Sequence, residues 1–168
     1  NSEFMTPAHD AALKPDLLRY VGEVAPHTLT TCAPFCAAPL HMAVENPESL
    51  AVIHAAIGSE AMVHTKCLLG ETIAHQAARL HTYTSLEWII EHLPHGIFST
   101  CAPSGALPQH IAALFGRPAQ LQMLLELGVD PLATDHIGWN VAHYAAAFGN
   151  RATEPRFYNS FVHVAEAW

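Results

Sequence analysis

Apolar residues recur at helical spacing along the chain, in short alanine-rich segments that alternate with longer segments rich in leucine and isoleucine. Near the N-terminus, Leu17, Leu18 and Val21 fall on one side of a predicted helix and are expected to be buried. The same spacing predicts a helix over residues 48–57 that ends at Gly58. The side chains that mark two further helices are Leu86, Ile89, Ile90 and Leu93 in one, and Phe157, Phe161, Val164 and Trp168 in the other. The pattern therefore predicts alternating short and long helices.

A His-x-Ala pair recurs five times, beginning at His9, His41, His75, His110 and His143. The separations are 32, 34, 35 and 33 residues, so the chain is divided into units of similar length. A unit of this size cannot bury its apolar faces alone and needs neighbours on which to pack. The sequence therefore predicts a stack of helical units.

Glycines occur at two fixed distances from the motif histidines, and both sets of glycines repeat with the same separation as the histidines. Gly70, Gly105 and Gly138 lie five residues before a motif histidine, whereas Gly116 and Gly149 lie six residues after one. Glycine adopts positive φ at low cost, so these positions are predicted to form hairpin turns and helix ends. Cys36 and Pro47 replace the two glycines in the second unit, and His81 replaces the second glycine in the third. Residues 59–69 are expected to hold a hairpin and its approach, with the alternative that residues 61–63 extend the preceding helix.

These residues resemble the ankyrin repeat, whose hallmark is Gly-x-Thr-Pro-Leu-His-x-Ala-Ala-x-x-Gly, over nearly the whole chain. The resemblance implies an all-α ankyrin-repeat solenoid of about five helix-turn-helix units with short hairpin loops. It also implies that the motif histidines are structural and bridge adjacent turns by hydrogen bonds. Thr6, Thr72 and Asn140, at the first motif position, are expected to cap their helices. The predicted units are 5–36, 37–69, 70–104, 105–137 and 138–168, preceded by a cloning remnant over residues 1–4.

The family's usual contact positions imply a partner-binding face on the concave side of the array. Carried over to this sequence, the positions that we expect to bind a partner are Glu71, Arg79, Leu80, Leu114, Phe115, His136, Trp139 and Phe148, with Ile137 as a further hairpin position. Five of them form a possible apolar ridge, and aromatic and arginine side chains often anchor interfaces. The alternative is that these side chains pack against the next layer.

The charge of the chain argues against a nucleic-acid partner. The formal net charge is −8, and the chain has only 7 Lys and Arg residues to neutralise phosphates. No apolar run reaches the roughly 18 residues needed to cross a bilayer, and no export signal follows Met5. We therefore expect no membrane insertion and a cytoplasmic location, or the host cytoplasm if the chain is a secreted effector.

Candidate chemistry is sparse, and we expect no cofactor, no metal and no catalytic residues. Cys32 and Cys36 followed by His41 resemble half of a zinc site, but the repeat already uses that histidine and no second cysteine pair follows. The sequence contains no nucleophile elbow, phosphate loop or zinc-protease motif. A thiol enzyme based on Cys67 or Cys101 stays an alternative, although all four cysteines are expected to be free thiols.

The function that these features favour is protein–protein interaction through the concave face. The alternative is a targeting or scaffolding domain of a larger enzyme or secreted bacterial effector, whose catalytic part follows residue 168. The exposed aromatic pattern of the last predicted helix favours continuation beyond Trp168, because terminal solenoid units usually have a polar outer face.

Overall fold

The structure is a computed structural model that describes residues 7–32 and 38–148. All regular elements among these residues are helices, and no strand occurs among them. The prediction of an all-α fold is therefore confirmed. Five predicted features lie outside the described residues, namely the cloning remnant over residues 1–4, the cap at Thr6, Cys36, Gly149, and the last outer helix from Phe157 to Trp168.

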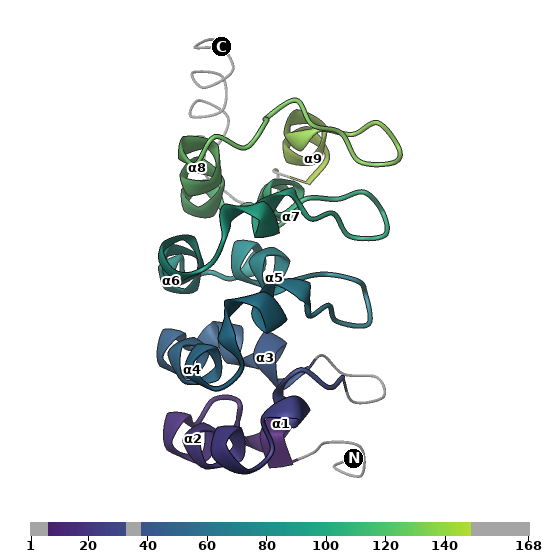
Figure 1. Cartoon of the computed structure of the whole chain (residues 1–168). Coiled ribbons are helices and arrows are strands. Elements are labelled where there is room, and N and C mark those ends of the chain that lie inside the picture. The colour runs from purple at the N-terminus through teal and green to yellow at the C-terminus, as the bar shows by residue number, and fades with distance from the viewer. Residues whose placement is uncertain (1–6, 33–37, 149–168) are drawn as a thin grey trace.

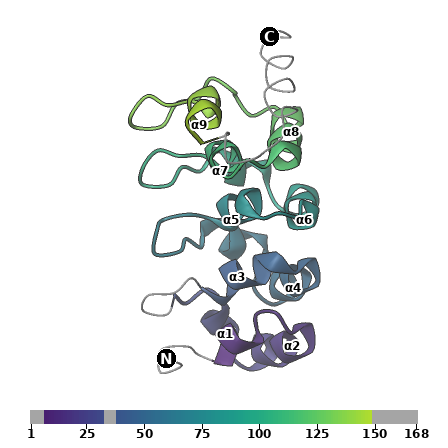
Figure 2. The same cartoon turned by 180° about the vertical axis from the view of Figure 1, so that it is seen from behind.

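The helices form two columns (Figures 1 and 2). In chain order they are α1 (Pro7–Ala11), α2 (Pro15–Val24), α3 (Pro39–Met42), α4 (Pro47–His64), α5 (Ile73–Arg79), α6 (Thr84–His92), α7 (Pro108–Leu114), α8 (Pro118–Glu126) and α9 (Val141–Phe148). The odd-numbered helices stack in an inner column from which loops project, and the even-numbered helices form an outer column. Helix α5 packs on α7 and α7 on α9, whereas α2 packs on α4. The described chain is thus an elongated solenoid.

Proline and asparagine set the starts of many helices. Prolines occupy the first turn of six of them, at Pro7, Pro15, Pro39, Pro47, Pro108 and Pro118. Proline suits this place because its fixed φ is helical and the missing N–H would have no helical partner. Asn46 caps α4 by accepting a hydrogen bond from the Glu48 N–H at 2.9 Å.

The core lies between the two columns and continues from one helix pair to the next. The inner helices contribute small residues such as Ala74 and Ala112, which allow neighbouring layers to approach closely. The outer helices contribute large apolar side chains that are buried, among them Leu18, Leu50, Ile53, Leu86, Ile89, Leu121 and Leu124. The burial predicted for Leu18 is confirmed, whereas Val21 is only partly buried. Leu17, however, is 43% exposed, because it lies on a side of α2 that the described chain does not cover.

The prediction that Gly58 ends the first segment of the outer helix α4 is confirmed, and residues 61–63 are helical because a second segment follows the break. Gly58 has non-helical angles (φ 76°, ψ 168°) and bends the chain, but helix resumes and runs to His64. This added segment buries Met62 completely. Short 3-10 helices follow α2 and α6 in the same way, over Pro26–Leu29 and His95–Ser99, and also bury apolar side chains.

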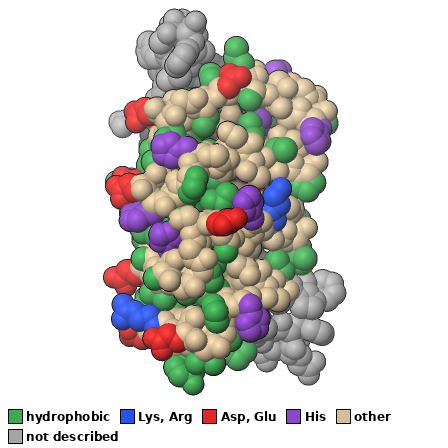
Figure 3. All heavy atoms as spheres, in the orientation of Figure 1, with side chains coloured by type: hydrophobic (Ala, Val, Ile, Leu, Met, Phe, Trp, Pro, Cys, Tyr) green, Lys and Arg blue, Asp and Glu red, His purple; other side chains and the backbone are tan. Residues whose placement is uncertain are grey.

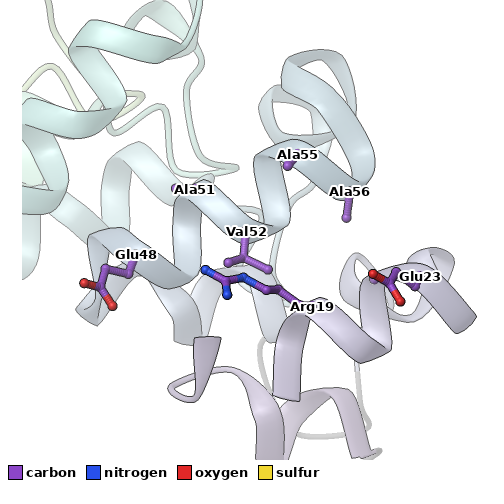
Figure 4. Close-up of a pocket in the computed structure, with 8 residues that line it drawn as sticks. Arg19, Glu23, Glu48, Ala51, Val52, Ala55 and Ala56 are labelled. Carbon is purple, nitrogen blue, oxygen red and sulfur yellow. The ribbon is translucent and has the colours of Figure 1, made fainter. Parts of the chain in front are cut away.

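The outer face is hollowed between α2 and α4 by an open groove of about 830 Å³ (Figure 4). Small residues line its floor, and Arg19, Glu23 and Glu48 stand around it. The two helices approach closely at one end, where a Cβ added to Gly22 would lie 2.9 Å from the Cβ of Ala56. The groove therefore lies beside a tight contact between small residues.

Candidate partner-binding face

Three five-residue turns of one design project from the inner column, at residues 67–71, 102–106 and 135–139 (Figure 1). In each turn the N–H of the first residue donates to the carbonyl oxygen of the fifth, and the glycine N–H donates to the carbonyl of the first. The second and third turns are joined because the His136 N–H donates to the Ser104 carbonyl at 3.0 Å. Backbone hydrogen bonds thus hold the loop tips in a defined row.

Three motif histidines tie a following loop to the inner helix of the preceding helix pair. Their Nε2 atoms bond carbonyl oxygens of the next loop, as His41 to Glu71 at 3.0 Å, His75 to Ala106 at 3.1 Å and His110 to Ala133 at 2.9 Å. In His75 the other ring nitrogen, Nδ1, accepts from the Thr72 N–H at 3.2 Å. This pattern assigns the proton to Nε2 of a neutral ring. The structural role expected of these three histidines is therefore confirmed.

Burial sets the charge state of these rings. Desolvation lowers the pKa of His75 from 6.5 to about 4, and the pKa values of His41 and His110 are lowered for the same main reason. At neutral pH the rings are therefore uncharged, which their hydrogen bonds require. Asn140 caps α9 as predicted, since its Oδ1 accepts from the His143 N–H at 3.2 Å.

Arg79 at the end of α5 links two helices of the inner column. Its Nη2 donates to both carboxylate oxygens of Glu71 at 2.8 Å, and the guanidinium carbon lies 5.0 Å from the ring centroid of Phe115. Gln76 also donates to Glu71, at 3.1 Å. Glu71 is only 7% exposed and so positions the arginine rather than offering itself to a partner. The arrangement holds a cation over an aromatic face, a contact that stabilises both side chains.

Aromatic rings cluster around the last described turn and α9. The Trp139 ring centroid lies 5.5 Å from that of Tyr144 and 6.4 Å from that of Phe148, and Tyr144 and Phe148 are 6.3 Å apart. The ring of His143 stacks beside Trp139 at 6.2 Å. Because each ring contacts at least one other, the cluster presents a pre-ordered aromatic surface.

Asp135 holds this aromatic cluster in place through hydrogen bonds of its carboxylate. Its carboxylate accepts from the Tyr144 hydroxyl at 2.7 Å and from the N–H groups of Ile137 and Trp139 at 3.0 and 2.9 Å. Burial works to raise the pKa of Asp135, but these hydrogen bonds outweigh it and hold the pKa below its usual value. Burial and the bond to Asp135 raise the pKa of Tyr144 to about 12. The turn and α9 are thus joined through one ionised carboxylate.

Replacing this carboxylate should loosen the aromatic cluster. We expect Asp135→Ala to lower the free energy of unfolding by about 2 kcal/mol, since a half-buried hydroxyl and two N–H groups lose a charged acceptor. Asp130→Ala is the matched control, because the Asp130 carboxylate accepts a single hydrogen bond, from the exposed Leu132 N–H. Urea unfolding followed by circular dichroism measures both values, and equal losses would contradict the anchoring role.

The structure places the residues predicted to bind a partner in four settings. Phe115 and Phe148 are exposed, by 41% and 38%, at equivalent places five residues after a motif histidine. Arg79 and Trp139 are half-buried and contact these two rings. Glu71 is buried, and Leu80 and Leu114 pack against the core. His136 is exposed on the third turn. The structure thus brings together two contact groups, Glu71 with Arg79 and Phe115, and Trp139 with Phe148.

Sequence reasoning missed two exposed apolar side chains at the first turn. Leu68 and Leu69 are 63% and 66% exposed, in the two positions before Gly70. His136 and Ile137 occupy the same two positions before Gly138, and Ile137 is also exposed. Counting back from the turn glycine is the signal that would have found the leucines.

The described residues show no other candidate chemistry. Among them, no group of three or more His, Cys, Asp or Glu side chains is arranged to hold a metal ion. Cys32, Cys67 and Cys101 are free, and His41 of the half-zinc pattern bonds a backbone carbonyl. No helix within residues 7–32 and 38–148 is both long and apolar enough to cross a membrane.

Comparison with known proteins agrees with this geometry. Residues 109–154 match the family of ankyrin repeats (many copies). The fold is similar to the ankyrin repeat domain of Bcl-3, described as a unique member of the IκB protein family, with a TM-score of 0.71 and 22% sequence identity. That match covers 84% of this chain and 65% of the Bcl-3 domain, so the chain spans about two thirds of its length. No curated protein sequence matches the chain. The chain therefore has the ankyrin-repeat fold, and its residues 109–154 are ankyrin repeats by sequence.

Proposed function

We propose that this chain is a protein-interaction module that binds a partner protein through its aromatic face. The aromatic face consists of Arg79, Phe115, His136, Trp139 and Phe148. The observation that carries the proposal is the exposure of Phe115 and Phe148 at equivalent places on neighbouring helices, each in contact with another member of the face. Large aromatic and arginine side chains contribute most of the binding energy in many interfaces.

The aromatic face is pre-organised, which favours binding. Glu71 fixes the guanidinium of Arg79, and Asp135 fixes Tyr144 and the turn that carries Trp139. Side chains that are already ordered lose little conformational entropy when a partner binds. With a net charge of −8, the chain suits a protein surface better than a nucleic acid. A targeting or scaffolding role within a larger enzyme or secreted effector would use this same face.

Removing the two exposed rings should abolish partner capture. We expect Phe115→Ala combined with Phe148→Ala to reduce the amount of captured partner at least about tenfold, because each truncated ring at an interface centre costs on the order of 1–2 kcal/mol. The measurement compares proteins retained from a cell lysate on immobilised chain, quantified by mass spectrometry.

The matched control is Tyr20→Ala, which removes an exposed aromatic ring from α2, outside the aromatic face. It should capture the same proteins as the unaltered chain. Circular dichroism and thermal unfolding confirm that both variants are folded. A folded double variant that retains full capture would contradict the proposed function.

A further inference from the structure

One aromatic ring of the inner column already binds a cation of the same chain. The guanidinium carbon of Arg79 lies 5.0 Å from the ring centroid of Phe115. Arg79 is four residues after the motif histidine of its unit, and Phe115 is five residues after the motif histidine of the next unit. The contact therefore joins two fixed positions of neighbouring repeats, and the repeat predicts where the same contact would recur in the next layer.

In the next layer the ring is present, but the cation is not. Phe148 is the equivalent of Phe115, whereas the equivalent of Arg79 is Leu114, which carries no charge. Within the part of the chain that the structure describes, Phe115 is the aromatic ring with an arginine or lysine over it. Phe148 is 38% exposed. It therefore offers a ring to solvent at the position where the repeat gives Phe115 a cation.

Phe148 belongs to a cluster with Trp139 and Tyr144, which provides more aromatic surface than the single ring of Phe115. The ring centroid of Phe148 lies 6.4 Å from that of Trp139 and 6.3 Å from that of Tyr144. The plane of Trp139 is tilted by 50° to Phe148 and by 78° to Tyr144, so the rings turn their faces in different directions. Tryptophan has the aromatic face that attracts cations most strongly. The cluster is thus better suited to hold a cation than Phe115 alone.

Asp135 adds a negative charge to this cluster. Its hydrogen bonds hold the pKa of the carboxyl group below its usual value, so the group is ionised at neutral pH. The carboxylate accepts from the Tyr144 hydroxyl at 2.7 Å, and this bond polarises the phenol toward the ring. A more electron-rich ring attracts a cation more strongly.

The charges near the cluster have one sign. Between Arg117 and Arg151 the sequence contains Glu126, Asp130 and Asp135 but no lysine or arginine. Among the described residues on the face shown in Figure 3, lysine and arginine side chains lie near the middle and toward the lower left. None lies at the upper end, where Figure 1 places α8 and α9. This end of the array therefore attracts positive charge.

We infer that Trp139, Tyr144 and Phe148 take an arginine side chain of the partner protein, whose guanidinium lies against Phe148 as that of Arg79 lies against Phe115. The inference rests on the proposed function and names the chemistry of the partner, a segment with an exposed arginine. Arginine suits the site better than lysine because its planar guanidinium stacks on aromatic rings and is more weakly hydrated.

The probe is a peptide with three arginines separated by glycines, and its matched control has citrulline in place of each arginine. Citrulline keeps the shape of arginine but carries no charge. Binding to the full chain at physiological salt is followed by NMR through the indole N–H signal of Trp139, which Trp139→Phe assigns. The arginine peptide should shift this signal at millimolar concentration, and the citrulline peptide should bind at least about threefold more weakly.

Phe148→Leu separates the aromatic ring from its apolar surface. It should weaken binding of the arginine peptide about two- to fivefold, as loss of an exposed cation–π contact does, and leave the citrulline peptide nearly unchanged. Phe148→Trp should strengthen binding of the arginine peptide. Tyr20→Leu, which removes an exposed ring from α2, should change neither. None of these variants alters the net charge, so general attraction of the peptide is the same in all, and circular dichroism confirms that each is folded.

Four outcomes would overturn the inference. An arginine peptide that leaves the Trp139 signal unmoved is one, and equal binding of the arginine and citrulline peptides is another. The third is an equal loss of both peptides in Phe148→Leu, which would make the surface merely apolar. The fourth is binding that appears only in Arg151→Gln, because an arginine of the chain itself would then compete for the ring.

The proposed function is judged separately. If the peptides fail but Phe115→Ala combined with Phe148→Ala still loses its captured proteins, the aromatic face binds a partner through apolar contacts. The proposed function would then stand without the arginine.

Discussion

Acidification should destabilise the solenoid well before its carboxylates become protonated. Between about pH 7.5 and about pH 5 we expect the free energy of unfolding to fall by about 2 kcal/mol through His75 alone. The pKa of this ring is about 4 in the native state and 6.5 in the unfolded chain, so the unfolded chain binds more protons across this window. The stabilisation is therefore complete above about pH 6.5 and is lost as the pH falls toward 4. His41 and His110 act in the same direction.

The atoms explain why the ring resists a second proton. In the native state Nδ1 of His75 accepts from the Thr72 N–H, while Nε2 donates to the Ala106 carbonyl. A proton on Nδ1 would remove the acceptor of the Thr72 N–H and place a charge in a site without exposure to solvent. Acid should therefore weaken the link between α5 and the turn at residues 102–106, together with the fold.

Urea unfolding at the two pH values, followed by circular dichroism, measures the loss. His75→Gln should be less stable at neutral pH, but its stability should change less between the two conditions, by about 2 kcal/mol. His64→Gln is the matched control because His64 is exposed, and this variant should keep the full pH dependence. An unchanged pH dependence in His75→Gln would contradict this explanation.

The repeated parts of the fold could be predicted from the sequence because their causes are local. A turn glycine and a proline in the first helical turn act through neighbouring backbone groups, as Gly105 and Pro108 do. The Nδ1 atom of His110 is local in the same way, since it accepts from the Leu107 N–H three residues earlier. The continuation of α4 to His64 was harder to predict. It depends on the burial of Met62 in the core, and the sequence around Gly58 also fits a turn.

The candidate site was predicted by position but not by accessibility. Phe115 and Phe148, which were predicted from equivalent repeat positions, are exposed, yet Glu71 is buried because Arg79 and Gln76 surround its carboxylate. Leu17, in contrast, was predicted to be buried but is exposed, since its burial would require a neighbouring layer against α2. Helical periodicity gives the side of a helix on which a residue lies, whereas the presence of a neighbour on that side is a property of the whole stack.

Gly105→Ala should be among the most destabilising single substitutions in the array, lowering the free energy of unfolding by about 3 kcal/mol or more. Gly105 has a φ of +82°, which costs an alanine about 1–2 kcal/mol. The added Cβ would also lie 2.6 Å from the backbone nitrogen of His136 and 2.6 Å from its ring. Because backbone cannot rotate away as a side chain can, the two turns must separate, which breaks the bond from the His136 N–H to the Ser104 carbonyl.

Gly138→Ala separates the cost of the positive φ from the cost of the contact between the added Cβ and the neighbouring turn. Gly138 has nearly the same φ, +81°, in the equivalent place of the next turn, but no atom of the described part of the chain lies within 4 Å of an added Cβ. The free energy of unfolding of Gly138→Ala should therefore fall only by the cost of an alanine at positive φ, about 1–2 kcal/mol. Urea unfolding of the two variants gives the difference directly, and it reports the contact between neighbouring turns. Equal losses in both variants would show that the turns at residues 102–106 and 135–139 do not support one another, and that the row of loop tips is held by its helices alone.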